Sequence, residues 1–293
     1  MIKQLAIAII ISGLTSSLST LISSPAWAET VLERVARTGV LNAGTRTDAV
    51  PFAYINAEGE WVGYSIDLLG LIRDRLEQEL GQEIELNLVE VTVADRIPRV
   101  QQGEVDLECG ATTYTSRRAR QVDFSVGFYQ TGTQFLVNQE ENLSSGELRV
   151  GILAGTTNAN VVERYLRVAR FVTLPNRMAG LQALQSNQID LLASDGILLE
   201  GLRQTADDPE SYAIIPRSPI QPEIYGCILP KNNPELQALI NQTILDFMQG
   251  VLDEREPDVA LFNRWFGEAG ATPGSASVLT DFFRQTLKSY REQ

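Results

Sequence analysis

From about residue 39 onward, short strand-like runs alternate with runs that have the apolar spacing of helices. Residues 40–43 and 84–91 have strand character, and a further strand ends at Cys109. Between them, apolar positions from Ile66 to Leu80 follow helical spacing until Gly81, and a short helix is expected at 96–102. This alternation predicts an α/β fold.

The second half of the chain repeats the pattern. Strands are expected at 149–153, 171–174 and 189–193, with helices at 158–168 and 177–186 between them. The stretch at 100–107 is similar to the one at 184–191, and both read as a helix end, a turn and a strand. We therefore expect two α/β lobes, followed by a long helix at 234–250, a segment at 261–266, and a C-terminal tail at 271–293 whose residues 278–290 are amphipathic.

Residues 1–28 have the pattern of a secretory signal peptide. Lys3 precedes an apolar run of about ten residues, and Ala26-Trp27-Ala28 forms a small-x-small cleavage pattern. The apolar run is short against the roughly 20 residues that span a bilayer. We expect cleavage after Ala28 and an exported, periplasmic, soluble chain.

Composition narrows the chemistry. The 293 residues suggest about two domains, and the net charge of -13 argues against binding to nucleic-acid phosphates. The chain contains no histidine, and lysine occurs only at positions 3, 231 and 288. Histidine-based catalysis and histidine-ligated metals are thus excluded, and no metal or cofactor is expected. Because arginine presents a planar fork that matches carboxylates, the composition favours recognition of anions.

The two cysteines, Cys109 and Cys227, lie in short apolar runs. In an oxidising compartment such a pair commonly forms a disulfide. The alternative is two buried free thiols, since cysteine is among the most buried residue types.

Several motifs together resemble a known family. They are Gly63-Tyr64-Ser65-Ile66-Asp67-Leu68, Arg96-Ile97-Pro98, Gln102-Gly103-Glu104-Val105-Asp106, Glu108-Cys109-Gly110-Ala111-Thr112-Thr113, Arg118, Asp123-Phe124-Ser125 and Tyr225-Gly226-Cys227. In this order they resemble the polar amino-acid solute-binding proteins of ABC importers, and most of all the periplasmic glutamate/aspartate-binding proteins. The resemblance covers about residues 30–268.

The resemblance implies a two-lobed periplasmic-binding-protein fold with two hinge strands and a central ligand cleft. Lobe one would comprise residues 29–127 and 226–270, and lobe two residues 133–219. The hinge strands would lie at 128–132 and 220–225. Both cysteines then fall in lobe one, which makes their pairing plausible.

The resemblance also assigns ligand contacts at the amino-acid end of the solute. Arg118 would receive the α-carboxylate, helped by Thr113 and by Thr157 at a helix N-terminus. Asp195 would bind the ammonium group, with an ordinary helix N-cap as the competing interpretation. Tyr64 would cover the aliphatic part of the ligand.

The other end of the ligand would face Arg46, Arg96 and Arg177, which together favour glutamate or aspartate over glutamine. Gly110 and Ala111 complete the predicted site. Ala111 and Val93 replace serines expected in the family, and Arg177 stands where histidine can occur. If Arg177 points to solvent instead, a mixed Glu/Gln/Asp/Asn binder is the alternative.

The resemblance implies a monomer that delivers an amino acid to a membrane permease with its ATPase. Two other classes stay open: a dehydratase-like enzyme in the same cleft, and the ligand-binding part of a membrane sensor. A pocket of arginines is expected to keep nearby carboxylates ionised, which argues against acid catalysis.

Overall fold

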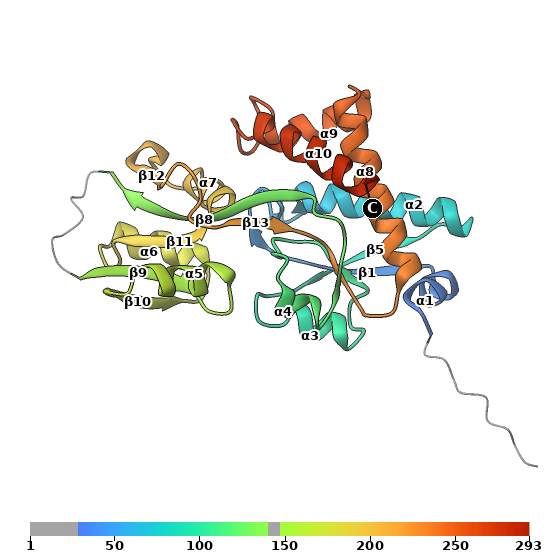
Figure 1. Cartoon of the computed structure of the whole chain (residues 1–293), viewed down its shortest axis with the longest axis horizontal. Helices are drawn as coiled ribbons and strands as arrows, with labels where there is room; N and C mark the ends of the chain where they lie inside the picture. The colour runs from blue at the N-terminus through green and yellow to red at the C-terminus, as the bar shows by residue number, and fades with distance from the viewer. Residues whose placement is uncertain (1–28, 140–146, 293) are drawn as a thin grey trace, which may run out of the picture.

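The computed structural model describes residues 29–139 and 147–292, and the expected signal peptide lies outside them. Two lobes lie side by side and are joined by strands that run between them (Figure 1). This arrangement confirms the expected two-lobed α/β fold. Among the described residues, no helix is both long and apolar enough to cross a membrane.

The sheet of lobe one is mixed. Its strand order is β5 (Glu85–Glu90), β1 (Val40–Thr45), β6 (Leu107–Glu108), β14 (Ile228–Leu229) and β7 (Asp123–Phe124). The central strand β1 pairs in parallel with β5 and β6, whereas β14 is antiparallel to β6 and β7. The helices are α1 (Val31–Thr38), α2 (Tyr64–Leu80), α3 (Arg96–Gln101) and α4 (Ser116–Ala119). As expected, α2 ends at Gly81, which adopts the left-handed conformation.

A small antiparallel sheet follows β1 and forms part of the wall of the cleft. It consists of β2 (Asp48–Ala49), β3 (Ala53–Ile55) and β4 (Trp61–Val62). Gly63 closes it with a φ of 142°, and a Cβ atom there would lie 2.0 Å from the carbonyl oxygen of Phe52. Only glycine has room at this position, because any side chain would collide with the backbone of Phe52. The contact between Gly63 and Phe52 keeps the small sheet packed against the start of α2.

The sheet of lobe two has the order β10 (Ala169–Leu174), β9 (Leu148–Leu153), β11 (Leu191–Asp195), β8 (Tyr129–Asn138) and β12 (Tyr212–Ile215). The helices α5 (Thr157–Tyr165), α6 (Arg177–Gln185) and α7 (Gly196–Arg203) pack on it, and a short 3₁₀ helix, η1 (Pro209–Ser211), precedes β12. The helix expected to reach residue 168 ends at Tyr165, because β10 begins at Ala169.

The two lobes are connected by a pair of antiparallel strands. The first part of β8 pairs with β13 (Pro222–Tyr225), with Tyr129 opposite Tyr225 and Gly132 opposite Pro222. Figure 1 shows both strands crossing from one lobe to the other. A small change of backbone angle in this two-stranded ribbon would rotate one lobe relative to the other.

The short internal similarity in the sequence corresponds to an equivalent structural device in each lobe. In lobe one the Asp106 carboxylate accepts a bond from the backbone nitrogen of Asn42 (2.7 Å) and pairs with Arg34. In lobe two the Asp190 carboxylate accepts from the backbone nitrogen of Arg149 (2.6 Å) and pairs with the side chain of that arginine. Each aspartate therefore ties the turn after a helix to a parallel strand of its lobe, β1 in lobe one and β9 in lobe two.

The C-terminal helices all pack on lobe one. They are α8 (Pro234–Leu252), α9 (Glu256–Phe266) and α10 (Ala276–Arg291). The predicted amphipathic tail is α10, which buries Leu279, Phe282, Phe283 and Leu287 and packs mainly against α8 (Figure 1). Cys109 and Cys227 form the expected disulfide, which joins the end of β6 to the residue before β14.

Because this disulfide closes a separation of 118 residues, its loss should release considerable chain entropy in the unfolded state. We expect the Cys109→Ser/Cys227→Ser double variant to lose about 2–5 kcal/mol of unfolding free energy. Denaturant unfolding of the oxidised wild type and the double variant would measure this. Coinciding unfolding midpoints would contradict it.

Candidate functional site

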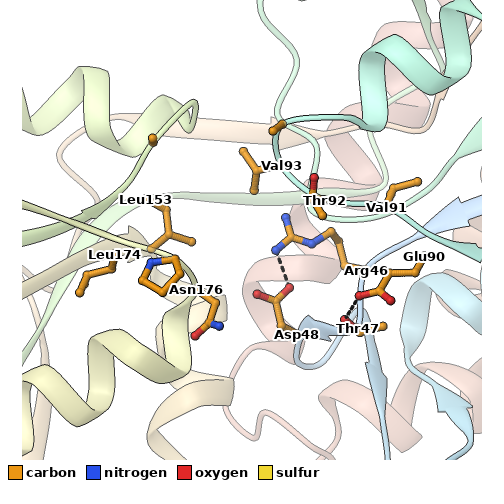
Figure 2. Close-up of a pocket in the computed structure, with 13 residues that line it drawn as sticks. Arg46, Thr47, Asp48, Glu90, Val91, Thr92, Val93, Leu153, Leu174 and Asn176 are labelled. Atoms are coloured by element: carbon orange, nitrogen blue, oxygen red, sulfur yellow. Dashed lines mark hydrogen bonds and ion pairs between the residues drawn. The ribbon is translucent and has the colours of Figure 1, made fainter.

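The cleft between the lobes contains a cavity of about 460 Å³. Figure 2 shows its two walls facing each other, with Arg46 and Asp48 on one side and Leu174 and Asn176 on the other. Lobe one contributes Arg46, Thr47, Asp48, Glu90, Val91, Thr92, Val93 and Ala94; lobe two contributes Leu153, Ala154, Leu174, Pro175 and Asn176. A second cavity of about 460 Å³ also lies between the lobes and includes Arg118 and Thr157 in its lining.

Arg118 is buried in the short helix α4, whose N-terminus is capped by Thr115. Its Nη1 donates to the carbonyl oxygen of Thr113 (2.8 Å) within lobe one, and its Nη2 donates to the carbonyl oxygen of Gly155 (3.3 Å) in lobe two. Burial lowers the pKa of Arg118, and the negative charge of Glu223 opposes this shift. Arg118 is therefore a cation that is held between the lobes by backbone carbonyls.

Arg96 begins α3 and is buried. Its Nη1 donates to the carbonyl oxygen of Ala111 (3.0 Å), while its Nε has no hydrogen-bond partner in the described part of the chain. Burial lowers the pKa of Arg96 to about 10, and Glu108 opposes this shift. The Nε is therefore a buried donor whose hydrogen-bonding capacity is unused among the described residues.

Glu108 is a counter-charge that the sequence reasoning missed. It is fully buried on β6; its Oε2 accepts a bond from the Thr112 hydroxyl (2.7 Å), and its Oε1 has no partner among the described residues. A Cβ atom at Gly110 would lie 2.4 Å from this Oε1. Gly110 thus leaves room for the carboxylate, which partly explains its place in the motif.

Arg46 and Arg177 come from opposite lobes, and both are buried, with exposed fractions of 7% and 5%. The Nε of Arg177 donates to the hydroxyl of Ser194 (2.9 Å), and its Nη1 makes no hydrogen bond within the described residues. Burial lowers the pKa of Arg177, and Asp48 opposes this shift. The alternative in which Arg177 points to solvent is therefore wrong.

Glu223 links lobe one, lobe two and the strand pair that joins them. This hinge residue of β13 accepts hydrogen bonds from the hydroxyls of Thr113 (2.6 Å) in lobe one, Thr157 (2.6 Å) in lobe two and Thr133 (3.3 Å) on β8. Sequence reasoning missed it, and the pattern of β13 gave no signal, since the charged Glu223 is buried while its apolar neighbour Ile224 is exposed. The structure thus brings Thr113 and Thr157 together around an internal carboxylate.

Asp195 is buried at the end of β11 and accepts a bond from the Nδ2 of Asn158 (3.2 Å). It occupies the N-cap position of α7, but its side chain makes no capping bond. The competing interpretation of Asp195 as an ordinary N-cap is therefore wrong, because its carboxylate accepts no hydrogen bond from the first turn of α7.

The expectation that arginines keep the nearby carboxylates ionised stays a prediction, because burial and the arginines shift the pKa of Asp195 and Glu108 in opposite directions. Burial raises the pKa of Asp195, Glu223 and Glu108 despite the cations around them. In Glu223 the charge of Asp195 adds to this rise. Removal from water disfavours the charged form of each acid, and for Asp195 and Glu108 this effect outweighs the arginines, which lower the pKa.

Tyr64 lies apart from the charged groups. It is fully buried at the start of α2 and packs against the rings of Phe52, Phe128, Phe247 and Phe266. These rings belong to the core of lobe one. The structure therefore brings Arg46, Arg118 and Thr157 to the walls of the two cavities and Arg177 to within 3.8 Å of Asp48, but it places Tyr64 in the core.

Residues 41–268 match the family of bacterial extracellular solute-binding proteins, family 3. The chain belongs to this family. The family is described as extracellular proteins that bind solutes, which agrees with the resemblance seen in the motifs.

Individual relatives differ in the solute that they are named for. The chain is 28% identical to a glutamate/aspartate import solute-binding protein of Salmonella typhimurium, over 90% of this chain and 89% of that one. It is 29% identical to a glutamine-binding protein of Bacillus subtilis, over 77% and 80%. In fold it is similar to an ancestral amino-acid-binding protein described as a precursor of cyclohexadienyl dehydratase, with a TM-score of 0.68, 22% identity, and coverage of 80% and 99%.

We expect Glu223→Gln to change how stability depends on pH. The folded state raises the pKa of Glu223. The contribution of its protonation to the free energy of unfolding is therefore fully present below the unfolded-state pKa of about 4.3, and it is lost as the pH rises through the folded-state pKa. Glutamine does not titrate, so the unfolding free energy of the variant should gain on that of the wild type as the pH rises above about 4.3.

Urea unfolding between pH 4 and 8 would test this. Glu58→Gln, an exposed position in the turn between β3 and β4, controls for the removal of one surface carboxylate. A constant difference between Glu223→Gln and the wild type across this range would contradict the raised pKa.

Proposed function

We propose that this protein is the extracytoplasmic solute-binding component of an ABC importer and that it captures glutamate or aspartate between its lobes. The observation that carries the proposal is the set of buried arginine donors at the cleft. Arg96 Nε and Arg177 Nη1 have no hydrogen-bond partner among the residues described. Buried donors without partners are costly, and a carboxylate is the group that satisfies guanidinium donors best.

The two ends of an amino acid would meet different chemistry. Arg118 and Thr113 would receive the α-carboxylate, and the buried acids Asp195 and Glu223 offer acceptors for the ammonium group. Arg46, Arg96 and Arg177 would surround the distal carboxylate. A bound ligand would thereby stabilise the closed lobes, since these groups come from both of them.

The signal-peptide pattern supports export to the periplasm, and family membership supports delivery to a permease driven by an ATPase. The protein itself would be a binding component without catalysis. A broader Glu/Gln/Asp/Asn binder is the second candidate, because Asp48 already pairs with Arg46 and thereby offsets one of the cations at the distal end.

Calorimetric titration of residues 29–293 with L-glutamate, L-aspartate, L-glutamine and L-arginine, after unfolding and refolding to remove co-purified ligand, tests the proposal. Arg118→Ala should weaken binding of glutamate by about 2–5 kcal/mol, which is roughly 30-fold or more, because a buried charge pair loses one partner. Arg120→Ala is the matched control, since Arg120 is exposed in the same segment. Folded wild-type protein that binds none of the four amino acids would refute the proposal.

Arg96→Ala tests the distal end separately. Because Arg96 would contact the distal carboxylate, we expect its loss to weaken glutamate binding by about tenfold or more and glutamine binding by much less. The same titrations measure both. Equal displacement of bound glutamate by glutamine from the wild type would end the claim of an acidic ligand.

A further inference from the structure

Asp48 places an internal carboxylate between the two arginines of opposite lobes. It lies on β2, two residues after Arg46, and its Oδ1 accepts a bond from the Nη2 of Arg46 (2.5 Å). Its Oδ2 lies 3.8 Å from the Nη1 of Arg177, across the cleft. Figure 2 shows the Asp48 carboxylate pointing toward the Arg46 guanidinium within the cavity.

The three side chains differ in their access to water. The side chains of Arg46 and Arg177 are 9% and 6% exposed, whereas that of Asp48 is 29% exposed. Asp48 is thus the most solvated of the three side chains. Turning it toward water costs less free energy than turning either guanidinium. The arginines are held more firmly, since Arg177 also donates to Ser194 from its own lobe.

An acidic ligand would need these same two guanidiniums. Its distal carboxylate must either displace Asp48 or share the arginines with it at short range, where two like charges repel. A glutamine side chain meets no such repulsion, because its amide carries no charge and its NH₂ group can donate to the Asp48 carboxylate.

Resting on the proposed function, we propose that Asp48 is a specificity-determining residue: its carboxylate competes with the distal carboxylate of an acidic ligand for Arg46 and Arg177. Asp48 thereby reduces the difference in affinity by which the protein prefers glutamate over glutamine. It also forms an ion pair across the lobes that a ligand must replace.

The test is Asp48→Asn, which keeps the size of the side chain and removes its charge. Titration with L-glutamate and L-glutamine should show glutamate binding about tenfold tighter than in the wild type, with glutamine binding unchanged or weaker. Asp74→Asn is the matched control, because Asp74 is an exposed carboxylate on α2 that pairs with Arg73. This control should leave both affinities unchanged.

A double-mutant cycle distinguishes competition for the arginines from a general effect of charge. In an Arg177→Gln background, Asp48→Asn should gain much less glutamate affinity than in the wild type, because one of the contested cations is absent. Equal gains in the two backgrounds, or equal shifts for glutamate and glutamine, would overturn the role of Asp48.

The outcomes also separate this inference from the proposed function. Glutamate binding by the wild type that weakens in Asp48→Asn would refute the competition while leaving the proposed function intact. Folded wild type and Asp48→Asn that both bind neither amino acid would refute the proposed function, and the inference with it.

Discussion

The burial of four guanidinium groups between two lobes is the constraint on which the rest of the structure depends. Like charges at short range in a poorly solvated cleft repel one another, and each charge loses its hydration. Four carboxylates and several backbone carbonyls offset this repulsion and replace part of the lost hydration. The cations are Arg46, Arg96, Arg118 and Arg177, and the acids are Asp48, Glu108, Asp195 and Glu223.

This arrangement couples electrostatics to the motion of the lobes. Arg118 contacts a carbonyl of lobe two, Arg177 reaches Asp48 of lobe one, and the hinge residue Glu223 holds a threonine of each lobe. Separation of the lobes would break the contacts of Arg118 with Gly155 and of Arg177 with Asp48, and it would pull Glu223 away from one of its two threonines. Closure and the desolvation of the charges are therefore one event, and a ligand influences both by satisfying donors that the closed protein leaves open.

The lobes themselves are held firmly enough to act as units. Asp106 and Asp190 tie corresponding turns to β1 and β9, and the disulfide joins the end of β6 to the chain that returns from lobe two. Helix α10 covers α8 with an apolar face and so enlarges the core of lobe one. A rotation of one lobe relative to the other would therefore be absorbed mainly by the ribbon formed by β8 and β13.

The sequence by itself determined the α/β alternation and indicated the cysteine pair, because periodicity and residue type are local properties of the chain. The arginines of the proposed site followed only from motifs that resemble a known family. The sequence did not identify Asp48, Glu108 or Glu223, since a carboxylate becomes a counter-charge only through neighbours that folding brings from distant segments. Tyr64 was misplaced for a related reason: an aromatic ring suits a ligand or a core equally well. Only the tertiary structure decided these cases, because burial and pairing depend on distance in space.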